Sequence, residues 1–94
     1  MNVVGTNKLE DLKRKHADVA GAVDAWLAEA AEANWTSPHE VKVRYPSASI
    51  LGGGLVVFNL RGSQYRVLTR IDYRSQAVLV LTAGTHADYD GWET

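Results

Sequence analysis

Apolar residues recur at a helical spacing near the start of the chain, after a short apolar run, 1–4, that predicts a β-strand. The segment 8–15 is strongly charged, and its two leucines are three positions apart, as on the buried stripe of a surface helix. Asn7, with Glu10 three positions later, has the pattern of a capping box. We therefore predict a helix over 8–15 that is capped by Asn7.

A longer helix is predicted over 19–33, where apolar residues are spaced by three, four and seven. Its many alanines favour helix formation and close packing, and Asp18 stands where a capping side chain is expected. The apolar stripe consists of Val23, Trp26, Leu27 and Ala30. We expect Trp26 to anchor the core.

A third, short helix begins at 37–40, which combines an N-cap serine, a proline at the first helical position and a glutamate that closes a capping box. It ends before Tyr45, because Pro46 disfavours helical backbone in the preceding residue. His39 in its first turn is expected at the surface. His16 follows a basic run and suits the C-terminus of the first helix, where the helix dipole favours a cation.

From residue 48 onward the pattern changes to the alternation of β-strands. Strands are predicted over 48–51, 55–60, 65–72 and 77–83, with turns over 52–54, 61–64 and 73–76. The last strand is uniformly apolar, which is typical of a central strand buried on both faces. Gly84 ends this strand, and a polar tail follows.

These elements predict an α+β domain with the N-terminal strand and helices packed on one face of a mainly antiparallel sheet of four to five strands. In the predicted strand 55–60, Asn59 lies on the face opposite the apolar residues, together with Arg61 if the strand continues. Along the next strand, Arg66 and Arg70 share a face, and Tyr65 lies on the other, apolar face. Because the apolar faces pack on the helices, Asn59 and the two strand arginines are expected on the open side of the sheet.

The composition fits one folded domain. The chain has 94 residues, of which 46% are hydrophobic and 22% charged, so we expect a single domain over 1–94. The absence of cysteine excludes disulfides, thiolate zinc sites, iron–sulfur clusters and cysteine nucleophiles. The uncharged, largely apolar stretch 76–85 is too short to cross a bilayer, and the first residues lack the apolar core of a signal peptide. We therefore expect a soluble cytoplasmic domain without membrane contact.

The net charge of −1 hides a segregated distribution of charges. The segment 42–74 has six basic residues and a single acidic residue, Asp72, whereas 17–34 has acidic charges only. Five of the six cations are arginines, whose planar guanidinium matches phosphate better than the point charge of lysine does. This indicates a polyanion-binding surface, with solvated arginines on a strand face as the alternative.

The sequence lacks the patterns of several common kinds of site. The glycines at 52–54 precede a strand, so they cannot place a helix N-terminus against a phosphate. The three histidines lie far apart without clustered carboxylates, which gives no metal-binding spacing, and no serine hydrolase signature is present. We therefore expect neither a metal nor a cofactor.

The polar tail combines His86, Tyr89 and Asp90 just beyond the end of a central strand, where loops often contribute functional residues. Arginines that neutralise a phosphorane, bordered by titratable groups that move protons, meet the requirements of metal-free phosphodiester cleavage. A loop-capping role for His86 is the alternative. The sequence does not decide whether Trp35 and Trp92 lie in the core or on a surface that binds a partner.

Three segments, in this order along the chain, resemble the HigB family of type II toxin–antitoxin toxins within the RelE-like superfamily: 41–49, 57–67 and 84–90. The resemblance covers essentially the whole chain, including the stretch around Trp26 and the Trp35–Thr36 pair. It implies a RelE-like fold and ribosome-dependent cleavage of messenger RNA in the ribosomal A site. In that reaction the ribose 2′-hydroxyl attacks the adjacent phosphate, without metal, and leaves a cyclic phosphate and a 5′-hydroxyl.

The resemblance also implies roles for individual residues. Arg66 of the Tyr-Arg pair corresponds to the phosphate-binding arginine of the superfamily, and His86 to a residue that acts on the leaving group. Asn59 stands where some relatives have a lysine, so activation of the 2′-hydroxyl is unassigned, with Tyr89 or Asp90 as the better candidates. Four further cations are expected to bind the RNA backbone: Lys42, Arg44, Arg61 and Arg70.

The implied partners are a cognate HigA antitoxin, the ribosome with its messenger RNA, and operator DNA only through the antitoxin. The main alternative is a module of the same fold that has lost cleavage and serves only as antitoxin partner or co-repressor; the Asn59 departure supports it. A free RNA- or DNA-binding protein is a third interpretation. It would need stacking aromatics on the open sheet face, and Tyr65 is expected on the opposite face.

Overall fold

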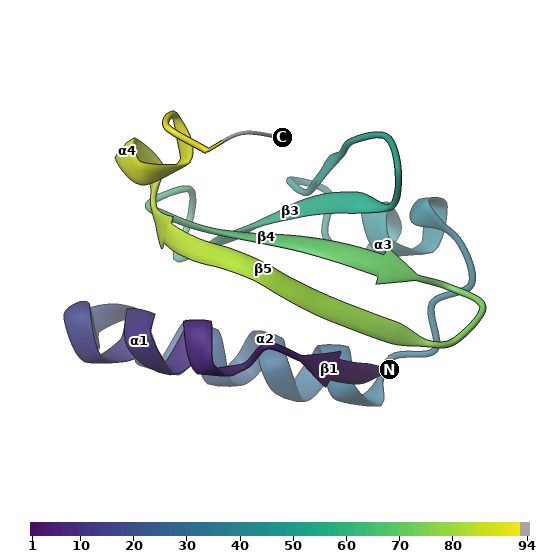
Figure 1. Ribbon diagram of the computed structural model, residues 1–94, viewed down its shortest axis with the longest axis horizontal. Helices are drawn as coiled ribbons and strands as arrows, with labels where there is room; N and C mark the ends of the chain where they lie inside the picture. Colours follow the sequence, from purple (N-terminus) through teal and green to yellow (C-terminus); the bar gives the residue numbers. More distant parts are fainter. Residues whose placement is uncertain (93–94) are drawn as a thin grey trace.

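The computed structural model describes residues 1–92, which form a five-stranded mixed sheet with the order β1-β5-β4-β3-β2 (Figure 1). The strands are β1 (Asn2–Val4), β2 (Ser49–Ile50), β3 (Leu55–Leu60), β4 (Tyr65–Asp72) and β5 (Ala77–Thr85). β1 runs parallel to β5, and every other neighbouring pair is antiparallel. The predicted α+β class and the mainly antiparallel sheet are confirmed.

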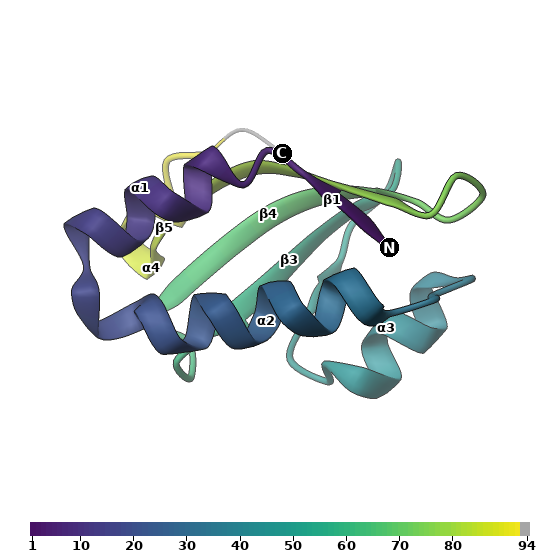
Figure 2. The ribbon, with the colours of Figure 1, turned by 90° about the horizontal axis from the view of Figure 1, so that it is seen from below.

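The helices are α1 (Asn7–Lys15), the short 3₁₀ helix η1 (Ala17–Val19), α2 (Ala20–Glu32), α3 (Pro38–Arg44) and α4 (His86–Tyr89). α1 and α2 lie side by side across one face of β3, β4 and β5, whereas α4 lies on the other side of the sheet (Figures 1 and 2). We call the sheet face opposite α1 and α2 the open face. Within residues 1–92, no helix has the length and apolar character needed to cross a membrane.

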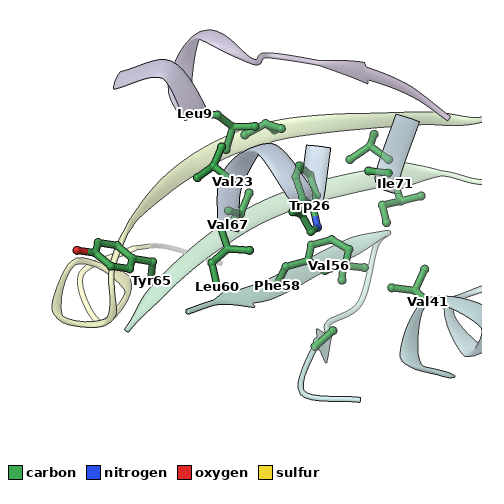
Figure 3. Close-up of a cluster of buried hydrophobic side chains, with 14 of the residues drawn as sticks. Leu9, Val23, Trp26, Val41, Val56, Phe58, Leu60, Tyr65, Val67 and Ile71 are labelled. Atoms are coloured by element: carbon green, nitrogen blue, oxygen red, sulfur yellow. The ribbon is translucent and has the colours of Figure 1, made fainter. Parts of the chain in front are cut away.

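The core lies between the helices and the sheet and is centred on Phe58, which is 1% exposed (Figure 3). The centroid of its ring lies 5.2 Å from those of Trp26 and Tyr45 and 6.1 Å from that of Trp35. Trp26 is therefore the core anchor that its spacing predicted. Trp35, which the sequence left open, is 7% exposed and belongs to the core rather than to a partner surface.

The predicted capping box at the start of α1 is wrong. Asn7 is the first residue inside the helix, and Thr6, which precedes it, makes no side-chain capping bond. The backbone carbonyls of Gly5 and Thr6 accept the first amide hydrogens of the helix instead. With those donors satisfied by backbone, the first turn has no need of the Asn7 side chain.

Asp18 does not cap the second helix either. It lies inside η1, and α2 is preceded by Val19, which has no capping side chain. The Asp18 carboxylate instead accepts a hydrogen bond from the hydroxyl of Tyr65. At the start of α3 the N-cap serine is as predicted, since the Ser37 hydroxyl accepts from the backbone N–H of Glu40 at 3.4 Å. The Glu40 carboxylate does not close the predicted capping box, because it accepts from the backbone N–H of Thr36 at 2.6 Å.

β5 differs from its prediction in burial and in length. Val78 and Val80 are fully buried, but Leu79 between them is 41% exposed, because α1 and α2 cover only one face of the sheet. The strand also continues through Gly84 to Thr85. The polar tail then forms α4, whose capping box is visible in the sequence as Thr85 followed three positions later by Asp88.

Candidate functional site

The open face brings together polar residues from neighbouring strands. Asn59 on β3 lies directly opposite Arg66 on β4, and Arg66 lies opposite Gly84 on β5. Residues opposite one another share a face of the sheet, so the predicted placement of Asn59 and Arg66 on one face is confirmed. Arg70, four pairs further along, lies on the same face opposite Leu55.

Arg66 is the central cation of this face. It is half-buried, and its guanidinium carbon lies 4.6 Å from the centre of the Tyr89 ring. Its Nε is buried without a hydrogen-bond partner, and no acidic side chain within residues 1–92 forms a salt bridge with it. This guanidinium contacts an aromatic ring and forms no salt bridge with the described residues. Because it is planar, it is suited to bind the oxygens of an anion through two parallel hydrogen bonds.

Asn59 is held in a defined orientation beside Arg66. Its Nδ2 donates to the backbone carbonyl of Ser47 at 2.8 Å, and its Oδ1 is buried with no partner in the part of the chain described. The amide therefore presents an acceptor, next to the unpartnered donor of Arg66, on adjacent strands. Two neighbouring buried polar groups without a partner in residues 1–92 are unusual in a folded protein and are a feature of functional positions.

The segment after β5 is anchored by a complete capping box. The Thr85 hydroxyl accepts from the Asp88 N–H at 3.1 Å, and the Asp88 carboxylate accepts from the Thr85 N–H at 3.0 Å. That backbone bond is the main reason the pKa of Asp88 lies below its usual value. The backbone N–H of His86 also donates to the carbonyl of Gln64 at 2.9 Å, which ties α4 to the β3–β4 turn.

α4 places three of the predicted site residues on one short segment. His86 is its first residue and is exposed, Tyr89 is its last and packs against Arg66, and Asp90 follows it, also exposed. The structure therefore brings Asn59, Arg66 and Tyr89 into one cluster. His86 and Asp90 extend from the two ends of the helix that carries Tyr89.

The four other predicted RNA-binding cations lie apart from this cluster and are each engaged with protein. Lys42 donates to the carbonyl of Ala48, Arg44 pairs with Glu29, Arg61 pairs with Asp18, and Arg70 donates to the carbonyl of Gly53. Arg61 was expected on the face of Asn59 only if the strand continued to it, and this condition is not met. The strand ends at Leu60, and Arg61 has a left-handed backbone with φ of 52°, which turns its side chain toward Asp18 on the helical side.

The Tyr65–Asp18 contact was not visible in the sequence. Tyr65 is buried on the core face, as predicted, and its hydroxyl donates to the Asp18 carboxylate oxygens at 2.9 and 3.0 Å. Burial, and then this hydrogen bond, raises the pKa of Tyr65. The same hydrogen bond is the main cause that lowers the pKa of Asp18. The partners are 47 positions apart, and no local pattern connects them.

Acid is expected to destabilise the protein partly through Asp18. Its folded-state pKa lies below the usual 3.8, so its stabilising contribution is present above that value and is lost as the pH falls through the folded-state pKa. Tyr65→Phe removes the main cause of the shift, so the free energy of unfolding should fall more at pH 7 than at pH 3. Urea unfolding at the two pH values measures this, and an equal loss at both would contradict it.

The sequence also left open where Trp92 lies. Its indole lies beside Tyr89, with the two ring centroids 5.5 Å apart, and it is partly exposed. Trp92, which the sequence analysis did not assign to the site, therefore contacts the Tyr89 ring that holds Arg66.

Comparison with known families gives one match. A family model described as HigB toxin, the RelE-like toxic component of a toxin–antitoxin system, matches residues 19–92. The matched range includes Asn59, Arg66 and the whole of α4. A comparison with curated protein sequences gives no match.

Proposed function

Because the chain belongs to the HigB family, the RelE-like toxic components of toxin–antitoxin systems, we propose that it cleaves messenger RNA in the A site of the ribosome. The five-stranded mixed sheet with packed helices is consistent with the RelE-like fold. Membership implies an antitoxin partner and suggests ribonuclease activity in general. The ribosome requirement, the reaction chemistry and the residue roles are the proposal.

The observation that supports the proposal is the guanidinium of Arg66, which forms no salt bridge within residues 1–92, beside Asn59 on the open face. Arg66 binds the phosphate to be cleaved and neutralises the negative charge that grows on its oxygens as the phosphorane forms. The Tyr89 ring holds the guanidinium from one side, so that little reorganisation is needed when the charge develops. The unpartnered Oδ1 of Asn59 accepts a hydrogen bond from the ribose 2′-hydroxyl.

The proton steps involve the residues of α4 and the residue after it. The 2′-oxygen attacks the adjacent phosphorus while Tyr89 or Asp90 takes the hydroxyl proton. The bond from phosphorus to the 5′-oxygen breaks, and His86 gives a proton to that leaving oxygen. The products are a 2′,3′-cyclic phosphate and a 5′-hydroxyl, formed by side chains of this chain and the RNA itself.

The remaining basic residues account for affinity in this proposal. Lys42, Arg44, Arg61 and Arg70 exchange their protein partners for phosphates of the RNA backbone, which makes binding dependent on salt and largely independent of base identity. The toxin acts in the cytoplasm, where ribosomes are, and a HigA-type antitoxin neutralises it. The complex contacts operator DNA through the antitoxin.

Primer extension on a defined messenger RNA in a reconstituted translation reaction tests the proposal. Cuts inside codons that need ribosomes, with cyclic-phosphate and 5′-hydroxyl ends, are the expected result. Intact RNA in the presence of ribosomes and folded protein would overturn the nuclease proposal and favour the partner-binding module without cleavage.

His86→Ala is expected to lower the cleavage rate by about two orders of magnitude, because the leaving oxygen loses its proton donor. Growth inhibition on expression should be lost with it. His39→Ala is the matched control, since His39 is exposed on α3, and it should remain toxic. If His86→Ala is as toxic as the wild type, His86 is not the general acid.

A further inference from the structure

The chain turns back on itself after α4 and returns an aromatic side chain to the sheet. The backbone N–H of Gly91 donates to the carbonyl of Asp88, and that of Trp92 donates to the carbonyl of Tyr89, both at 3.0 Å. The Trp92 indole meets the Tyr89 ring at 73°, edge to face. Trp92 is thus placed by defined backbone and ring contacts.

The indole lies against bare backbone of β5. A Cβ added at Gly84 would come within 2.8 Å of Oδ2 of Asp88 and within 3.2 Å of Cζ2 of Trp92, so a larger residue here would crowd both side chains. Gly84 lies opposite Arg66 in the sheet. On the open face, the Tyr89 ring therefore contacts both the guanidinium of Arg66 and the indole of Trp92.

Trp92 is the tryptophan that remains accessible. Trp26 is 2% and Trp35 7% exposed, and both pack against Phe58, whereas Trp92 is partly exposed on the open face. Packing in the core accounts for the presence of Trp26 and Trp35 but not for that of Trp92. A partly exposed indole next to a phosphate-binding arginine has the chemistry of a stacking surface for a nucleobase.

We propose that Trp92 stacks on a base of the messenger RNA next to the phosphate held by Arg66. This rests on the proposed function and adds a substrate-binding residue to it. A base is separated from its neighbouring phosphate by one sugar, and the Arg66 guanidinium and the Trp92 indole both contact the Tyr89 ring, so one nucleotide can reach both groups. Every base has an aromatic face, so the contact contributes affinity and position more than base choice.

The test compares Trp92→Ala and Trp92→Phe with the wild type in the reconstituted reaction, on intact messenger RNA and on RNAs with an abasic nucleotide at each A-site codon position in turn. Trp92→Ala should lower the single-turnover rate on intact RNA by about 10- to 100-fold, and Trp92→Phe should retain most of the rate. At one codon position, removal of the base should slow the wild type by a similar factor and slow Trp92→Ala no further.

Additive losses at all three positions would overturn the proposal, because they mean that the indole supports the fold around Tyr89 and touches no base. An unchanged rate for Trp92→Ala would overturn it as well, while leaving the nuclease proposal intact. If the wild type does not cleave intact RNA on ribosomes, the proposed function fails and the stacking proposal fails with it.

Discussion

Arg66→Ala is expected to lower the rate of ribosome-dependent cleavage by about two to three orders of magnitude, the usual cost of removing one preorganised group that stabilises transition-state charge. Arg66 is the cation placed beside Asn59 and held by Tyr89, and no acid within residues 1–92 competes for it. Single-turnover cleavage with saturating toxin measures the loss. Arg66→Lys should recover only part of the rate, since an ammonium lacks the planar fork.

Arg70→Ala is the matched control for this prediction. Arg70 is on the same strand and the same face, but its guanidinium already donates to the carbonyl of Gly53 at 3.0 Å, away from Tyr89. A loss of less than about tenfold is expected, mainly in binding and most evident at low salt. The two variants should unfold at similar urea concentrations. Equal losses of rate for Arg66→Ala and Arg70→Ala would show that charge alone matters and that the site has been misplaced.

Phe58→Ala is expected to lower the free energy of unfolding by about 3–5 kcal/mol, the usual cost of removing a buried aromatic side chain. The ring is 1% exposed and contacts three other aromatic rings, those of Trp26, Trp35 and Tyr45, from different helices and loops. A cavity at this point therefore loosens contacts between α2, the α2–α3 connection and β3. For a small domain, this loss is a large part of the total stability.

Urea unfolding followed by tryptophan fluorescence measures this loss, because two of the affected rings are tryptophans. Val43→Ala is the control, since Val43 on α3 is 66% exposed, and it should change the free energy of unfolding by less than about 0.5 kcal/mol. A loss below about 1 kcal/mol for Phe58→Ala would mean that the aromatic cluster is not the centre of the core.

The sheet strands and their faces could be predicted because their signal is local. In β3 and β4 the side chains alternate with a period of two, so Asn59 and Arg66 are assigned to the face opposite Phe58 and Tyr65 without knowledge of any distant contact. The same reasoning could not place Arg61, one position beyond the strand. A residue in a turn no longer follows the alternation, and its backbone conformation decides its direction.

The start of the second helix, in contrast, could not be predicted from local sequence. Asp18 has the chemistry of an N-cap, but its carboxylate has two alternative donors, the amides of the next turn and the hydroxyl of Tyr65. The second donor comes from a strand far along the chain and is supplemented by the charge of Arg61. Local sequence shows only the first option, so the choice between the two was beyond prediction from residue types.

The amino-acid sequence by itself determined the order of elements as far as the last strand, the open and buried faces of β3 and β4, and the residue types that could act on a phosphate. These follow from spacing and side-chain chemistry, which are properties of neighbouring residues. Tertiary structure alone decided that α4 places Tyr89 over Arg66 and that Trp92 returns to Gly84. Such contacts depend on the paths of strands paired across the sheet, and their geometry exists only once the sheet has formed.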